Sequence, residues 1–186
     1  MSELIRATRI RVMRGRMRCE LLVGSGAPRD TNSELMRRVL AAFPTLPDHA
    51  CVNELGDTFG AVMDDTPLPH LIEHLVIDLQ VRSALDGRGG VAEQVVPGSR
   101  AADRGGVPSS RGGVAASREG AGSPRSGRGA APNSVYVGMS EWVDEDAGAA
   151  LVEVSFTDDL VALAAFRDAI RFVNSILQPV PASLLR

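Results

Sequence analysis

The spacing of apolar and polar residues predicts five strands in this chain. Near the start, Ile10 and Val12 alternate with Arg9 and Arg11, which is the two-residue period of a half-buried strand. Later, the polar run Asp-Glu-Asp-Ala-Gly at 144–148 separates two apolar runs and is typical of a hairpin turn. The expected strands span residues 4–13, 19–23, 58–63, 135–143 and 150–156.

Three other segments have the three- and four-residue apolar spacing of helices. Their ends carry the expected signals, because polar N-cap residues precede them and prolines follow two of them. The expected helices span residues 34–43, 67–85 and 160–177. The order β-β-α-β-α, insert, β-β-α predicts an α+β fold, in which an antiparallel or mixed sheet has its helices packed on one face.

Residues 86–133 interrupt this pattern with a run of Gly, Ser, Ala, Pro and Arg that has almost no large apolar residue. Such a segment buries too little surface to offset the entropy lost on ordering, so a long disordered insert is expected. The rest of the chain is long enough for one core. We therefore expect residues 1–186 to form a single α+β domain that contains this insert.

The most informative motif is His-Leu-Ile-Glu-His at residues 70–74. In a helix His70 and His74 lie one turn apart on the same face, where two imidazoles can bind one metal ion. H-x-x-E-H is the order found in inverzincins, and Glu73 is then placed to act as general base on a water molecule. The motif predicts a Zn²⁺ site with Glu73 as the catalytic residue.

The residues around the motif indicate that its helix is covered on both sides. One broad apolar face carries the residues Leu71, Ile72, Leu75, Val76 and Leu79. His70 and His74 lie on the opposite side, in a stripe that continues with Ile77 and Val81 rather than with charged residues. Buried imidazoles need polar partners, and a shared metal ion would be one.

A catalytic zinc site needs a third protein ligand. Inverzincins take it from a downstream carboxylate, so Glu153 is the first candidate and Glu141 the second, although each could instead be an exposed strand residue. His49 precedes the motif, so no downstream histidine is available. Cys19 and Cys51 also precede it and form no C-x-x-C pair, and they read as small buried hydrophobes.

Composition excludes several classes of protein. All 20 basic residues are arginine, so Walker A, Schiff-base and kinase-like or ATP-grasp sites are not expected. A net charge of -3 gives no reason to expect nucleic acid or a membrane as a partner. No apolar signal region or membrane-spanning run is found, so we expect a cytoplasmic protein; a homodimer is the default expectation.

The segment Pro69–Gln80 resembles the N-terminal domain of cyanophycin synthetase, which carries a helix of the form H-x-x-E-H-x-A-x-E-L-Q. The stretch Val152–Asn174 is similar to a later strand-and-helix unit of that domain. The chain departs from the family in two places. Asp78 stands where the family usually has a glutamate. The family's downstream glutamate does not align cleanly, since Glu153 and Ser155 both lie in the corresponding region. The family's ligase domains are absent, so a synthetase is not expected.

The resemblance implies an α+β domain that holds an Arg- and Asp-rich polymer and, in some members, cuts it at a zinc site on this helix. The sequence therefore favours a zinc-dependent hydrolase of amide bonds in a peptide or cyanophycin-like polymer. His70 and His74 would bind the zinc, and Glu153 or Glu141 would complete the site. The alternative is a non-catalytic module of the same kind that binds a charged polymer or a partner protein.

Overall fold

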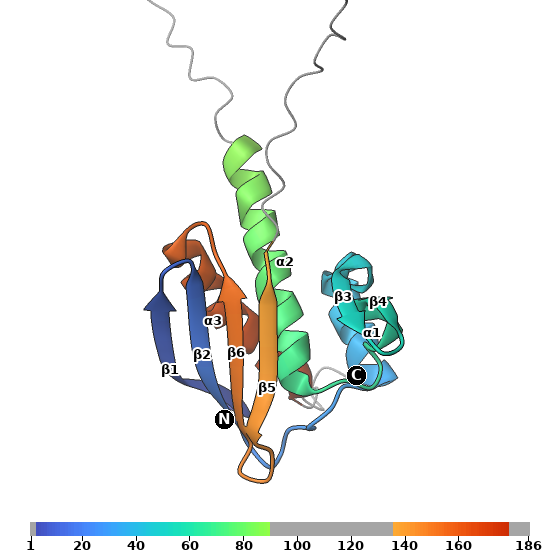
Figure 1. The fold of residues 1–186 in the computed structure, drawn as a ribbon. Helices are drawn as coiled ribbons and strands as arrows, with labels where there is room; N and C mark the ends of the chain where they lie inside the picture. The colour runs from blue at the N-terminus through green and yellow to red at the C-terminus, as the bar shows by residue number, and fades with distance from the viewer. Residues whose placement is uncertain (1–2, 90–135, 179–186) are drawn as a thin grey trace, which may run out of the picture. The chain divides into compact units, whose positions relative to one another are not determined.

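The computed structural model describes residues 3–89 and 136–178. It has a four-stranded antiparallel sheet in the order β1-β2-β6-β5, a separate hairpin formed by β3 and β4, and three α-helices (Figure 1). The elements are β1 (Ile5–Met13), β2 (Arg16–Val23), α1 (Ser33–Ala42), β3 (Ala50–Asn53), β4 (Gly56–Thr58), α2 (Leu68–Gly89), β5 (Gly138–Asp144), β6 (Ala149–Ser155) and α3 (Asp159–Leu177). The predicted α+β fold is confirmed.

The core lies between the sheet and the helices α2 and α3, which pack on one face of the sheet and against each other (Figure 1). Because side chains alternate along a strand, every second residue of β2 and β6 points toward these helices. Those residues are fully or almost fully buried: Met17, Cys19, Leu21, Ala150, Val152 and Val154. None of the helices in the described part of the chain is long and apolar enough to cross a membrane.

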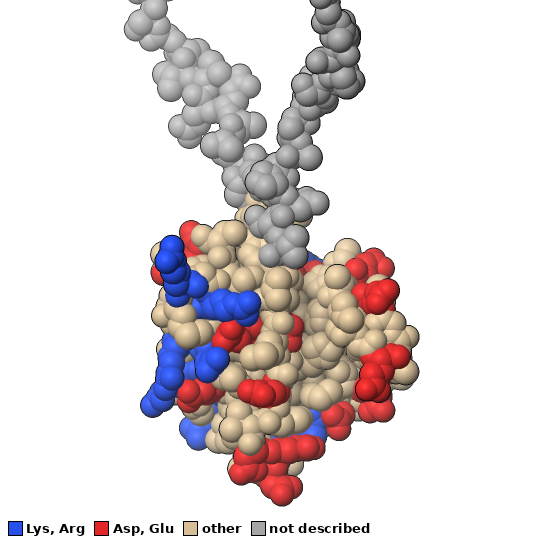
Figure 2. Space-filling view, viewed as in Figure 1, with Lys and Arg blue, Asp and Glu red and all other residues tan. Residues whose placement is uncertain are grey.

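The other face of the sheet carries arginine side chains from β1 and β2 (Figure 2). Two glutamates lie among them. Glu20 is 3.8 Å from Arg9 and 3.7 Å from Arg11, and Glu153 of β6 binds the two arginines Arg16 and Arg18. The arginines are a third or more exposed, so water screens their ion pairs and limits their contribution to stability.

Asn174 of α3 fixes the beginning of β1. Its side-chain oxygen accepts hydrogen bonds from the backbone N–H groups of Leu4 and Ile5, each 2.9 Å long. Its amide nitrogen donates to the Ile5 carbonyl over 2.7 Å. An asparagine amide placed this way satisfies buried backbone groups that β2 does not reach, so the edge strand is held to the helix layer as well as to the sheet.

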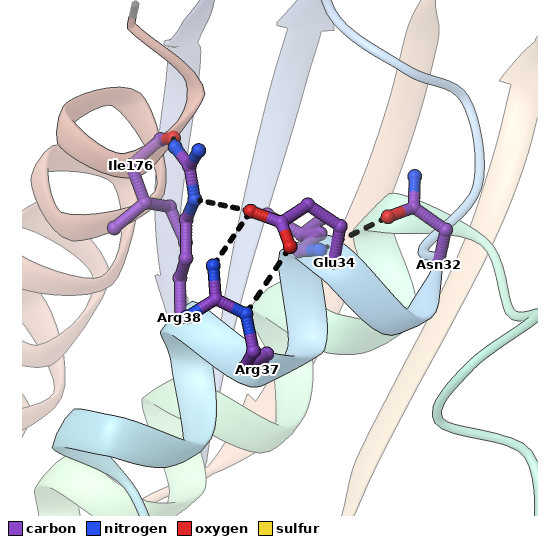
Figure 3. A network of polar contacts seen from close by, with 6 residues as sticks. Asn32, Glu34, Arg37, Arg38 and Ile176 are labelled. Atoms are coloured by element: carbon purple, nitrogen blue, oxygen red, sulfur yellow. Dashed lines mark hydrogen bonds and ion pairs between the residues drawn. The ribbon is translucent and has the colours of Figure 1, made fainter. Parts of the chain in front are cut away.

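Helix α1 is capped at its start by Asn32 and linked through Arg38, in its middle, to the end of α3 (Figure 3). The Asn32 side chain accepts from the Leu35 N–H at 2.9 Å, which is the usual N-cap bond. Glu34 binds Arg37 and Arg38 on the surface. Arg38 also donates to the carbonyl oxygen of Ile176 at 2.9 Å, so it satisfies one of the free carbonyls at the end of α3, whose last turn has no basic residue.

Two sequence expectations need correction. Residues 58–63 do not form a strand, because β4 ends at Thr58 and the chain continues into a 3-10 turn at Phe59–Ala61, where Phe59 turns inward and is fully buried. Helix α2 also runs four residues beyond the expected end at residue 85, since an established helix gains one backbone hydrogen bond with each added residue. The remainder of the expected insert, residues 90–133, lies outside the described residues.

Gly148 and Gly15 provide a matched pair for a stability prediction. Both have φ = +73°, which L-residues rarely adopt, but an added Cβ at Gly15 meets nothing, whereas at Gly148 it would overlap the Val23 carbonyl oxygen. We expect Gly15→Ala to lower the free energy of unfolding by about 1 kcal/mol and Gly148→Ala by about 3 kcal/mol or more. Urea denaturation measures both, and equal losses would show that the hairpin shifts freely away from β2.

Candidate metal centre

Helix α2 carries the H-x-x-E-H motif and is covered on two sides. Its apolar face packs on the sheet and α3, and the residues there, Leu71, Ile72, Leu75 and Val76, are fully buried. The segment between α1 and α2 also contacts α2 and carries the hairpin β3–β4. As a result His74 is only 3% exposed and His70 is half-buried, which confirms that the histidine side is covered.

The two motif histidines turn the same ring nitrogen toward each other. Their Nε2 atoms lie 3.2 Å apart, and the Sγ atom of Cys51 in β3 is 3.4 Å from Nε2 of His70. The candidate ligand atoms of Cys51, His70 and His74 all lie within 4.8 Å of one another. In the described part of the chain, this is the one group of three such residues that could hold a metal ion.

The outer nitrogens of both histidines already have partners. Nδ1 of His70 lies 2.7 Å from the Thr66 hydroxyl, and Nδ1 of His74 lies 3.4 Å from Nδ1 of His49. Nε2 of His49 is in turn 3.3 Å from a carboxylate oxygen of Asp78. Metal-binding histidines generally have such a partner on the second nitrogen, which fixes the ring and its tautomer.

These contacts are compatible with one set of proton positions. With the His49 proton on Nε2, toward Asp78, Nδ1 of His49 is an acceptor and Nδ1 of His74 is the donor. Nε2 of His74 then presents a lone pair to His70, and a proton on Nε2 of His70 would lie in the 3.2 Å gap between the two rings.

The electrostatic surroundings keep the motif histidines neutral. Burial lowers the pKa of His74 to about 3, with smaller contributions from His70 and His49, and burial also lowers the pKa of His70. Burial acts to raise the pKa of Asp78, but the contacts with His49 and Thr45 and the charge of Arg82 together lower it. Neutral imidazoles beside an ionised outer carboxylate are the form that binds metal ions.

Glu73 lies in the same pocket as the histidines and Cys51. This pocket, of about 530 Å³, is bounded by residues 136–142 on one side and 50–52 on the other, with α2 between them. The Glu73 side chain is almost fully buried and accepts a 2.7 Å hydrogen bond from the Ser140 hydroxyl of β5. Burial raises the pKa of Glu73, and the Ser140 hydrogen bond opposes this shift.

Neither glutamate expected as the third ligand joins this group. Glu153 alternates with the inward-facing Val152 and Val154, so its side chain is on the opposite face of the sheet, where Arg16 and Arg18 bind it. The hydrogen bond from Arg18 is the main reason that the pKa of Glu153 is lowered. Glu141 is an exposed residue at the rim of the pocket and is not among the grouped ligands.

Cys51 and His49 lie in the candidate site, although the motif did not predict them there. Both residues precede the motif, and the short hairpin β3–β4 brings Cys51 back over the start of α2. The interpretation of cysteines as buried hydrophobes holds for Cys19, which is fully buried, and is wrong for Cys51, which contacts His70. A usable signal was present, since all three histidines of the chain lie within 26 residues and Cys51 stands among them.

Comparison with known proteins supports one part of the sequence interpretation. Residues 16–97, less than half of the chain, match the family model of the cyanophycin synthase-like N-terminal domain. The matched segment contains Cys51 and the whole H-x-x-E-H motif but not β5, β6 or α3. No curated protein and no solved structure matches the chain.

Proposed function

We propose that this protein is a zinc-dependent hydrolase of amide bonds, with Cys51, His70 and His74 as the zinc ligands and Glu73 as the general base. The observation that carries the proposal is that one pocket contains three mutually close candidate ligands and a buried carboxylate. The family match to residues 16–97 supports the type of domain but does not by itself assign an activity.

Two of the three spacings between the candidate ligands fit zinc, and the third, from Cys51 to His74, is within 4.8 Å. Ligand bonds of about 2.0–2.1 Å for nitrogen and 2.3 Å for sulfur in a tetrahedral site place two nitrogens about 3.3 Å apart and a nitrogen and a sulfur about 3.6 Å apart. The corresponding distances here are 3.2 Å between the two Nε2 atoms and 3.4 Å from Cys51 Sγ to His70 Nε2. Two imidazoles and a thiolate are also a ligand set that zinc prefers, and they leave a fourth position free.

Glu73 is suited to move protons in this pocket. Zinc, when bound, would supply Lewis acidity, which activates water and polarises an amide carbonyl. The Glu73 carboxylate can take the proton of the attacking water and deliver it to the departing amine. Its pKa is raised toward neutral pH, which suits a group that both accepts and donates a proton. Ser140 holds the carboxylate in place through its hydroxyl.

The direct test combines metal analysis with an amide-hydrolysis assay on the full chain. We expect the protein, purified without chelator and resupplied with zinc, to contain one equivalent of zinc and to cleave peptides in a zinc-dependent way. Zinc without cleavage of any peptide or of an Asp- and Arg-rich polymer would favour the alternative, a non-catalytic binding domain. A zinc content well below one equivalent per chain after zinc is resupplied would exclude a zinc-dependent hydrolase.

His49 is expected to support the zinc site from outside. Its ring lies between His74 and Asp78, so its removal takes away the partner of the second nitrogen of His74. We expect His49→Ala to weaken zinc affinity by about 10–100-fold, measured by competition with a chromogenic chelator. Asp78→Asn, which keeps an acceptor oxygen for His49, should have a smaller effect, and a larger loss in Asp78→Asn than in His49→Ala would contradict this order of contacts.

A further inference from the structure

The sheet has two edges, and only one of them borders the pocket. β1 forms the outer edge; it carries Arg9 and Arg11, and its pairing with β2 is irregular between Ala7 and Arg9. Charged side chains and bulges of this kind discourage the addition of a further strand. β5 forms the other edge and has no basic residue and no proline; its pairing with β6 is regular from Gly138 to Trp142 and becomes irregular only between Trp142 and Asp144, and residues 136–142 line the pocket.

The hydrogen-bonding direction of β5 follows from one contact. The Ser155 N–H donates to the Val137 carbonyl at 2.7 Å, so Val137 faces β6. In an antiparallel pair this direction alternates, and the backbone groups of Gly138, Ser140 and Trp142 therefore point to the open edge. Within residues 3–89 and 136–178, no other strand pairs with that edge.

The side-chain positions of two of these residues, Gly138 and Ser140, lie beside the Glu73 carboxylate. Gly138, Ser140 and Trp142 pair with the inward-facing residues of β6, so they lie on the helix side of the sheet. The Ser140 hydroxyl binds Glu73, and an added Cβ at Gly138 would overlap the Glu73 carboxylate. A chain bound along this edge would pass directly over Glu73.

The dimensions of the pocket fit an extended chain. Strands rise about 3.4 Å per residue, so Gly138 to Trp142 spans about 14 Å and can pair with four or five residues. β3 forms the opposite wall, where Val52 is 91% exposed, and Val137 and Met139 are also about half exposed beside β5. Val137 and Met139 point to the outer face of the sheet, as Glu153 does, and can contact the outward side chains of a bound strand.

From these observations we propose that the pocket binds an extended polypeptide main chain as an added strand on β5, hydrogen-bonded to Gly138, Ser140 and Trp142. Only the cleavage of the bound peptide rests on the proposed function. The amide to be cleaved would lie beside Glu73 and the Cys51–His70–His74 group. Binding itself requires neither zinc nor catalysis. The substrate class is thus an unfolded peptide segment recognised by its backbone, with side chains selecting among sequences.

The test is a binding measurement on the zinc-free full chain. A library of unstructured octapeptides identifies a binder, and backbone hydrogen exchange is then measured by NMR with and without it. We expect the amides of Gly138, Ser140 and Trp142 to exchange fast in the free protein and to slow at least tenfold with peptide. The amides of Met139 and Glu141, which bond to β6, are the internal control and should be protected in both states.

A matched peptide tests the main-chain hydrogen bonds. The same octapeptide with alternate amides N-methylated should bind about tenfold more weakly or worse, because two hydrogen bonds to the edge are lost. Equal affinity of the two peptides, peptide binding without the alternating protection, or no octapeptide binding at 1 mM would each overturn the proposal. Zinc-dependent hydrolysis without the alternating protection would support the proposed function and overturn strand addition on β5. Peptide binding with alternating protection but without hydrolysis would support strand addition and contradict the proposed hydrolase function.

Discussion

Glu73→Gln is expected to lower the rate of amide hydrolysis by about 10²–10⁴-fold while leaving the zinc content at one equivalent. Glutamine has nearly the same shape and can still accept the hydrogen bond from Ser140, so the pocket should keep its geometry. It cannot take a proton from water. The expected loss is therefore in kcat, measured under saturating peptide, with little change in KM.

Glu141→Gln is the matched control for this prediction. Glu141 lies at the rim of the same pocket, three residues from Gly138 along β5, but it is exposed and is not among the grouped ligands. The substitution removes one negative charge, as Glu73→Gln does, without removing the proposed base. An equal fall in kcat for both variants would show that the charge of the pocket matters rather than proton transfer by Glu73.

Cys51→Ala is expected to weaken zinc binding by more than 100-fold, beyond the range found for residues that act only through another ligand. The thiolate would supply both a bond and the negative charge that balances part of the ion's charge. Zinc affinity is measured by chelator competition at fixed pH, because a cysteine binds zinc as the thiolate and the affinity therefore depends on pH.

Cys19→Ala and Glu153→Gln are the two controls for the effect of Cys51→Ala on zinc affinity. Cys19→Ala removes the other cysteine, which is buried beneath the helices and should affect stability but not zinc affinity. Glu153→Gln tests the carboxylate that the sequence favoured, and it should retain zinc because that side chain binds Arg16 and Arg18. Loss of zinc in Glu153→Gln together with its retention in Cys51→Ala would restore the glutamate as the third ligand.

Much of the fold could be predicted from the sequence because its signals are local. Two-residue alternation located four strands of the sheet, the Asp-rich turn at 144–148 located the β5–β6 hairpin, and N-caps and prolines bounded the helices. The region between α1 and α2 was predicted poorly. Its strands β3 and β4 have four and three residues, too few to show a period, and the burial of Phe59 within a 3-10 turn depends on contacts with α2.

The site was only half predictable for a related reason. The spacing of His70, Glu73 and His74 is a property of one helix and can be read directly. The third candidate ligand comes from a different element, and the position of Cys51 beside His70 depends on how the hairpin folds back. Strand parity in the sequence argues against Glu153, since Val152 and Val154 on either side of it are apolar and face the core.

The pairing of β2 with β6 has a consequence for how the protein is made. β2 ends at Val23 and its partner begins at Ala149, so about 125 residues must be synthesised between them. At about 5–20 residues per second, the buried face of β2, including Met17 and Leu21, waits about 6–25 s for β6, and the candidate ligands of α2 are synthesised within that interval. If the proposed zinc ion bound at that stage, it would hold β3 against α2 before β6 completes the sheet.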